Sequence, residues 1–126
     1  MNIKNTFKKF ILLNIGLFFL LFTSVFLESD EVIRFNESLD AIPTSLLIIS
    51  LIWIISYFVS FYFLYTFKKN GKKLFSILFV LGVVLNLPLG PSAVDSLMYT
   101  LDALSWCSQS AILVFLYFTP VQKYFK

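Results

Sequence analysis

Four polar residues within apolar stretches are the main candidates for chemistry: Asn86, Asp102, Ser105 and Gln109. At about 100° per residue on a helix, Asp102, Ser105 and Gln109 fall on one face. We expect this face to point into a helix bundle and away from lipid. Asn86 and Asp102 reach similar depths on either side of a short turn, so we predict that Asn86 donates a hydrogen bond to Asp102.

The Asp102 carboxylate has two interpretations. An acid inside a membrane span is a candidate for ion or proton handling. If its helix begins near Met98, however, Asp102 lies only about 6 Å from the helix end, close enough to reach headgroup water. Its role would then be structural. Gln109 lies deeper, and we expect it to hold neighbouring helices together.

The residues needed for most enzyme chemistry are absent from the sequence. There is no histidine and only one cysteine, Cys107, so the commonest general base and the usual Cys/His metal ligand sets are missing. No Gly-rich phosphate loop, HExxH, GxSxG or CxxC motif occurs. We therefore expect no enzymatic activity, no cofactor and no metal. The lysines form no basic aromatic face, so we expect no nucleic-acid partner.

The elements that must position the polar residues are membrane helices. Of the 126 residues, 59% are hydrophobic and 13% charged, whereas soluble domains contain about 25% charged residues. A helix that crosses a bilayer needs about 20 mostly apolar residues. We predict an all-α, four-transmembrane-helix bundle that forms one membrane domain over residues 1–126, without a soluble domain. The predicted spans are residues 8–27, 43–67, 73–91 and 98–119.

Helix contacts are predicted from small and polar residues. The short connection over residues 88–97 should make the third and fourth spans antiparallel neighbours, with Gly82 letting their backbones approach. Pro88 should kink the third helix or end it near Asn86. In the second span, Ser56 and Ser60 form a small-x-x-x-small pair that we expect to pack against another helix.

Asn14 is the polar residue of the first span, and we expect its amide to bond across to another helix. The basic and then apolar start of the sequence also resembles an export signal. Val25, Phe26 and Leu27 do not fit the small-residue pattern of a cleavage site, so we expect a retained anchor.

The charges orient the bundle. Lys and Arg are retained on the cytoplasmic side of membranes, and nine of the ten basic residues fall on one side of a four-span chain. This predicts an inner or plasma membrane protein with both termini in the cytoplasm. Those nine residues are Lys4, Lys8, Lys9, Lys68, Lys69, Lys72, Lys73, Lys123 and Lys126.

The acidic loop over residues 28–40 should lie on the opposite side of the membrane. Val32, Phe35 and Leu39 have helical spacing, which predicts a short amphipathic turn on the membrane surface. Asn36 begins a glycosylation sequon, which we do not expect to be used.

Polar helix faces in so small a bundle are costly unless they are paired. We therefore expect a protein that acts by binding, with the lipid bilayer and a membrane-protein partner or a second copy as its partners. An accessory subunit, an immunity-type protector and a member of a larger complex all fit this expectation. The alternative is a small transporter or channel that oligomerises and uses the polar face of the fourth span. A membrane enzyme is the third and weakest class.

Overall fold

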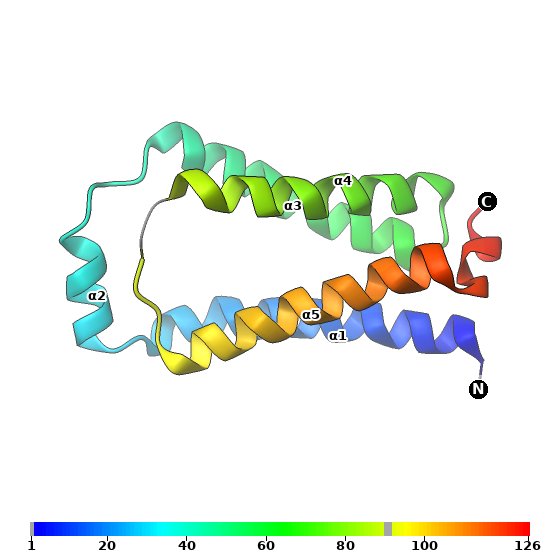
Figure 1. Ribbon diagram of the computed structural model, residues 1–126, viewed down its shortest axis with the longest axis horizontal. Coiled ribbons are helices and arrows are strands. Elements are labelled where there is room, and N and C mark those ends of the chain that lie inside the picture. The colour runs from blue at the N-terminus through cyan, green and yellow to red at the C-terminus, as the bar shows by residue number, and fades with distance from the viewer. Residues whose placement is uncertain (1, 90–91) are drawn as a thin grey trace.

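The computed structural model describes residues 2–89 and 92–126, which form five α-helices and no strand (Figure 1). The predicted all-α class is therefore confirmed. The helices are α1 (Ile3–Ser24), α2 (Asp30–Glu37), α3 (Thr44–Tyr65), α4 (Lys69–Asn86) and α5 (Ser96–Phe118). Short 3-10 helices follow α1, α4 and α5 at Val25–Leu27, Leu87–Leu89 and Pro120–Tyr124.

Three segments are long and apolar enough to cross a membrane, namely Ile3–Leu27, Thr44–Tyr65 and Ser96–Phe118. They agree with the predicted first, second and fourth spans to within a few residues, except that the helix of the first begins earlier. The protein is thus a small multi-pass membrane protein by the length and composition of its helices.

The predicted third span, 73–91, needs correction. Its helix, α4, begins at Lys69 and ends at Asn86, while residues 90 and 91 lie outside the described part of the chain. Three lysines occupy the first turns of α4, so this helix is not among the three apolar ones. Its end at Asn86 is one of the two outcomes predicted from Pro88, which cannot donate a backbone hydrogen bond.

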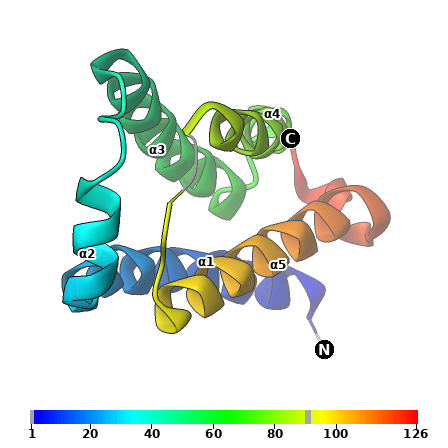
Figure 2. The same cartoon turned by 60° about the vertical axis from the view of Figure 1, so that its left-hand side comes forward.

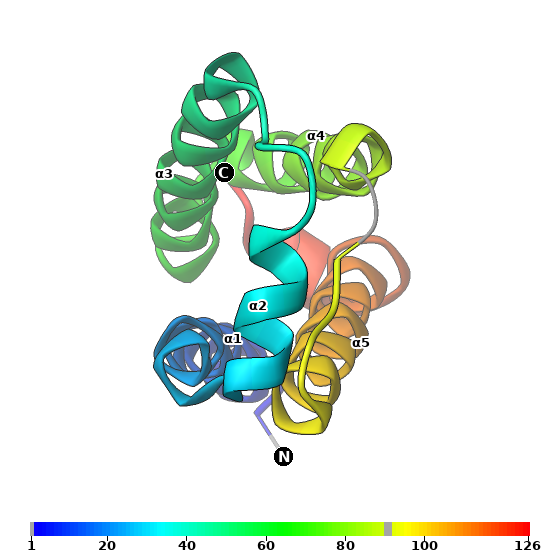
Figure 3. The same cartoon turned by 90° about the vertical axis from the view of Figure 1, so that its left-hand side faces the viewer.

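The four long helices form two pairs, α3 with α4 and α1 with α5 (Figure 1). Viewed from the α2 end, the two pairs lie on opposite sides of the bundle (Figure 3). The prediction that Gly82 brings α4 close to α5 is wrong. A Cβ on Gly82 would lie 2.6 Å from Cζ2 of Trp53, and a Cβ on Gly71 would lie 2.9 Å from the carbonyl carbon of Phe63. Both glycines therefore face α3, and α4 packs closely against that helix.

Most of the buried apolar residues belong to the half of the bundle where both termini lie, and Figure 1 shows the position of those termini. Aromatic side chains dominate this core, with ring centroids 5.0 Å apart for Tyr57 and Phe61 and 5.8 Å apart for Phe61 and Phe75. Such tilted and edge-on ring pairs stabilise a core beyond their buried area. The buried apolar residues are Phe7, Ile11, Tyr57, Phe61, Leu64, Phe67, Phe75, Leu78, Ile112, Leu116 and Val121.

The predicted amphipathic turn is the helix α2, which connects α1 to α3 across the opposite end of the bundle (Figure 2). Asn36 donates to the Ala93 carbonyl oxygen at 3.0 Å and accepts from the Ala93 amide at 2.9 Å. The Asp95 carboxylate accepts from the Ser29 amide at 2.7 Å and from its hydroxyl at 3.1 Å. These bonds fix α2 to the segment that precedes α5.

Candidate functional site

A cavity of about 280 Å³ lies between the two helix pairs in the half of the bundle nearer α2. We call it the main cavity. A second cavity of about 230 Å³ adjoins it and shares Leu21, Asn86, Met98 and Asp102. The main cavity is lined by Phe18, Leu21, Phe22, Val25, Trp53, Asn86, Met98, Asp102, Ser105, Trp106 and Gln109. Each of the four long helices contributes at least one of these residues.

All four polar residues predicted to cluster line the main cavity. Ser105 and Gln109 are buried, whereas Asn86 and Asp102 remain exposed. The Asn86 amide donates to the Gly82 carbonyl oxygen at 2.8 Å, not to Asp102 as predicted. Packing of Gly82 against Trp53 sets the rotation of α4, and the cavity lies between α4 and α5. The two side chains therefore face a common space without bonding to each other.

A hydrogen-bonded chain of three side chains closes the inner end of the main cavity, and we call this chain the floor. Ser105 and Gln109 line the cavity, and the buried Tyr57 lies beneath them. The Tyr57 hydroxyl donates to Oε1 of Gln109 at 2.7 Å, and Nε2 of Gln109 donates to the Ser105 hydroxyl at 3.0 Å. Gln109 thus joins α5 to α3, as expected for a residue that holds helices together. The Trp53 ring stacks on Tyr57 with centroids 4.9 Å apart, and its Nε1 donates to the Leu78 carbonyl oxygen at 2.8 Å. Tyr57 is thereby held in place from two sides.

The main cavity combines one negative charge with aromatic walls. Asp102 is its only ionisable acid, and Trp106 lies beside that carboxylate. Phe18, Phe22 and Trp53 supply further ring surface. A carboxylate among aromatic faces suits a cation that also carries apolar groups, because the faces of aromatic rings attract positive charge.

Below the floor, buried side chains of the core fill the space between the helices. Tyr57 belongs to the buried core, which continues through Phe61, Phe75 and Leu64 toward the termini. Among the described residues, the main cavity therefore reaches only partway along the bundle. This shape can hold a group that enters near α2, but it gives that group no open path through one chain.

The other predicted packing residues lie outside the cavity. Ser60 is fully buried, and its hydroxyl donates to the Tyr57 carbonyl oxygen at 2.6 Å. Ser56 is half-buried and bonds back to Ile52 on its own helix. Gly71 was not predicted to be a packing residue, yet a Cβ on it would meet the backbone of α3 at Phe63 and Leu64.

The prediction for Asn14 is confirmed. Its Nδ2 donates to the Ser108 hydroxyl at 2.6 Å and joins α1 to α5, whereas its buried Oδ1 has no partner. Cys107, one residue before Ser108, is exposed. Within the described residues, no group of three or more His, Cys, Asp and Glu side chains could hold a metal ion.

No pattern in the sequence brought Trp53 and Trp106 together. They are the only tryptophans in the chain, and both line the main cavity. The presence of only two tryptophans in the sequence was the one signal that could have drawn attention to them.

No protein-family model matches the chain, and neither a curated protein nor a solved structure matches it.

Proposed function

We propose that the protein crosses the membrane four times, with both termini in the cytoplasm, and acts by binding a cationic group in the main cavity. The observation that carries this proposal is the single carboxylate of Asp102 in an aromatic cavity with a closed floor. The occupant is a cation with an apolar body, such as a quaternary ammonium compound or a basic side chain on a partner membrane protein.

The placement of the termini supports a fourth crossing. Both termini and the turn between α3 and α4 lie at one end of the bundle, while α2 lies at the other (Figure 1). An even number of crossings is needed to return the chain to that end. The apolar part of α4, residues 74–86, is only roughly 20 Å long at 1.5 Å per residue. Lysine side chains that reach toward the headgroups and a locally thinned bilayer accommodate so short a helix.

The closed floor supports binding over transport. Passage through one chain would require Tyr57 and Gln109 to separate and the aromatic core beneath them to open. An accessory subunit or a member of a larger complex needs no such path, because it only has to hold its partner. A transporter built from several copies is the competing function, and a flux assay separates the two.

Tryptophan fluorescence tests the proposal directly, because both tryptophans line the cavity. Purified protein in detergent micelles is titrated with benzyltrimethylammonium, and neopentylbenzene serves as its neutral counterpart of the same shape. We expect saturable quenching by the cation alone. The substitution Asp102→Asn should weaken binding about tenfold or more, since it removes the only charge in the cavity.

Asp40→Asn is the matched control, because it removes one carboxylate from the exposed segment between α2 and α3. It should bind the cation as the unaltered protein does. Equal affinity in the Asp102 and Asp40 variants would refute the proposal. If the protein in vesicles instead carries the cation across the membrane, and Asp102→Asn abolishes that flux, the transporter is the correct function.

A further inference from the structure

A separate cavity of about 400 Å³ lies at the termini end of the bundle. We call it the lysine pocket. Three segments far apart in the sequence form it, namely the first turn of α1, the turn between α3 and α4, and the segment that follows α5. Its lining residues are Lys4, Thr66, Phe67, Lys68, Lys123, Tyr124 and Lys126.

Backbone contacts fix the shape of the lysine pocket. The Lys69 amide donates to the Lys126 carbonyl oxygen at 2.9 Å, and the Lys126 amide donates to the Phe67 carbonyl oxygen at 3.3 Å. Phe67 has a φ of 55°, a left-handed conformation that is unfavourable for a bulky residue. The surrounding contacts hold Phe67 in this conformation, and the centroid of its ring lies 5.3 Å from the ring centroid of Phe125.

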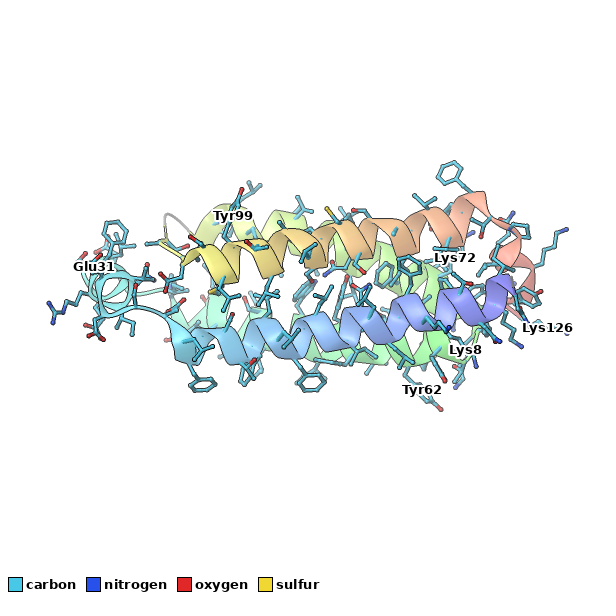
Figure 4. All side chains as sticks on the ribbon, turned by 90° about the horizontal axis from the view of Figure 1, so that it is seen from below. Lys8, Glu31, Tyr62, Lys72, Tyr99 and Lys126 are labelled. Atoms are coloured by element: carbon cyan, nitrogen blue, oxygen red, sulfur yellow. The ribbon has the colours of Figure 1, made fainter. Side chains whose placement is uncertain are left out.

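The lysines of the pocket have no acidic side chain near them. Figure 4 shows Lys8, Lys72 and Lys126 at one end of the bundle and Glu31 at the other. The seven acids of the sequence all belong to the α2 end or to the first half of α5. They are Glu28, Asp30, Glu31, Glu37, Asp40, Asp95 and Asp102. The acidic side chains of the protein therefore do not balance the charge of these lysines.

Aromatic rings position the ammonium groups around the pocket. Nζ of Lys4 lies 5.3 Å from the Phe67 ring centroid and 5.6 Å from that of Tyr124. Nζ of Lys8, just beside the pocket, lies 4.3 Å from the Tyr65 centroid. An ammonium group held over a ring keeps N–H donors for a further partner. The pocket thus presents several oriented donors and a concentrated positive charge.

We propose that the lysine pocket binds a phosphate-bearing anion. Lysine is a common ligand of phosphate groups, and basic pockets between membrane helices on the cytoplasmic side bind anionic lipid headgroups. The phosphate belongs either to an anionic lipid or to a soluble phosphate compound. This site is independent of the main cavity, which has the opposite charge and lies toward the other end of the bundle.

Two binding assays distinguish the sources of the phosphate. In the first, native mass spectrometry counts the lipids that stay bound after extraction from vesicles of equimolar phosphatidylcholine and phosphatidylglycerol. In the second, phosphorus NMR follows pyrophosphate titrated into the protein in neutral detergent. The variant is K4Q/K123Q, and the control is K9Q/K73Q, which removes two exposed lysines at the same end but outside the pocket.

We expect K4Q/K123Q to weaken binding roughly 30-fold and K9Q/K73Q to change it little. Loss of phosphatidylglycerol alone identifies a lipid headgroup, and loss of pyrophosphate alone identifies a soluble phosphate compound. Loss of both shows that the pocket accepts either source. If circular dichroism shows that K4Q/K123Q does not fold, Lys123→Gln alone should weaken binding about fivefold. No binding by the unaltered protein, or equal losses in the variant and the control, would overturn the proposal.

Discussion

Replacement of Gly71 by alanine tests whether α4 packs closely on α3. A Cβ at position 71 would lie 2.9 Å from both the carbonyl carbon and the Cβ of Phe63, and 3.0 Å from the Leu64 nitrogen. Two of these three atoms belong to the backbone of α3, so a side-chain rotation cannot relieve the contact. The two helices must move apart.

Gly16 provides the matched control, because a Cβ there meets nothing within 4 Å. Alanine is favoured over glycine inside a helix by up to about 1 kcal/mol. Gly16→Ala should therefore leave stability unchanged or raise it by that amount. At position 71, overpacking costs about 1–3 kcal/mol and exceeds the gain in helix propensity. We expect a net loss of about 1–2 kcal/mol for Gly71→Ala.

The free energy of unfolding is measured by titrating the protein in mixed micelles with sodium dodecyl sulfate and following helix content by circular dichroism. The two alanine variants should differ by about 2 kcal/mol, with Gly71→Ala the less stable. If Gly71→Ala is as stable as Gly16→Ala, α4 does not approach α3 as closely as described, and Gly71 is not needed for the contact between these two helices.

Two further predictions concern the cavity floor and the membrane topology. Tyr57→Phe leaves Oε1 of Gln109 buried without its donor. This substitution should lower the free energy of unfolding by about 1 kcal/mol in the same titration. The control Tyr99→Phe, at an exposed site, should leave that free energy unchanged. For topology, Cys107 is replaced by serine, and single cysteines at Lys9 and Glu37 are treated with a membrane-impermeant maleimide in intact cells. The cysteine at 37 should react and the one at 9 should not, and the reverse pattern would contradict the orientation.

The extents of α3 and α5 followed from the sequence to within two residues, because apolar runs between charges determine where a helix can cross lipid. The helix α1 begins at Ile3, five residues before the predicted span. The start of α4 was missed for a physical reason. Lys69, Lys72 and Lys73 belong to its first turns, but a long lysine side chain can carry its charge away from the helix axis while the backbone stays helical. Charge therefore marked the edge of the apolar region, not the beginning of the helix.

The pairing of the helices was harder to predict. A short connection suggested that α4 and α5 are neighbours, and side chains do join them, because the Phe79 and Trp106 ring centroids lie 5.4 Å apart and the Ser76 and Tyr117 hydroxyls 2.8 Å apart. The closely packed backbones, however, are those of α4 with α3 and of α5 with α1. The choice depends on how each helix is rotated about its axis, and Gly71 and Gly82 set that rotation for α4. A glycine shows that close approach is allowed, but the sequence does not say which helix approaches.

The polar face of α5 was predicted correctly for Ser105 and Gln109, because the helical period alone places them on the buried side. The partner of Gln109, Tyr57, lies 52 residues away on α3, and no local pattern connects them. The lysine pocket was missed for the same reason. Its lysines were explained one by one as topology signals, and only the fold brings Lys4, Lys68 and Lys123 around a common space.

The pairing of α1 with α5 has a consequence for how the protein is made. Asn14 bonds to Ser108, which is 94 residues further along the chain. At ribosomal speeds of about 5–20 residues per second, the first helix waits roughly 5–20 s before its partner is synthesised. The α3–α4 hairpin, by contrast, is complete as soon as its short turn has emerged. Assembly therefore begins in the middle of the polypeptide, and until the last helix arrives the Asn14 amide has only its bond to the Phe10 carbonyl oxygen of its own helix.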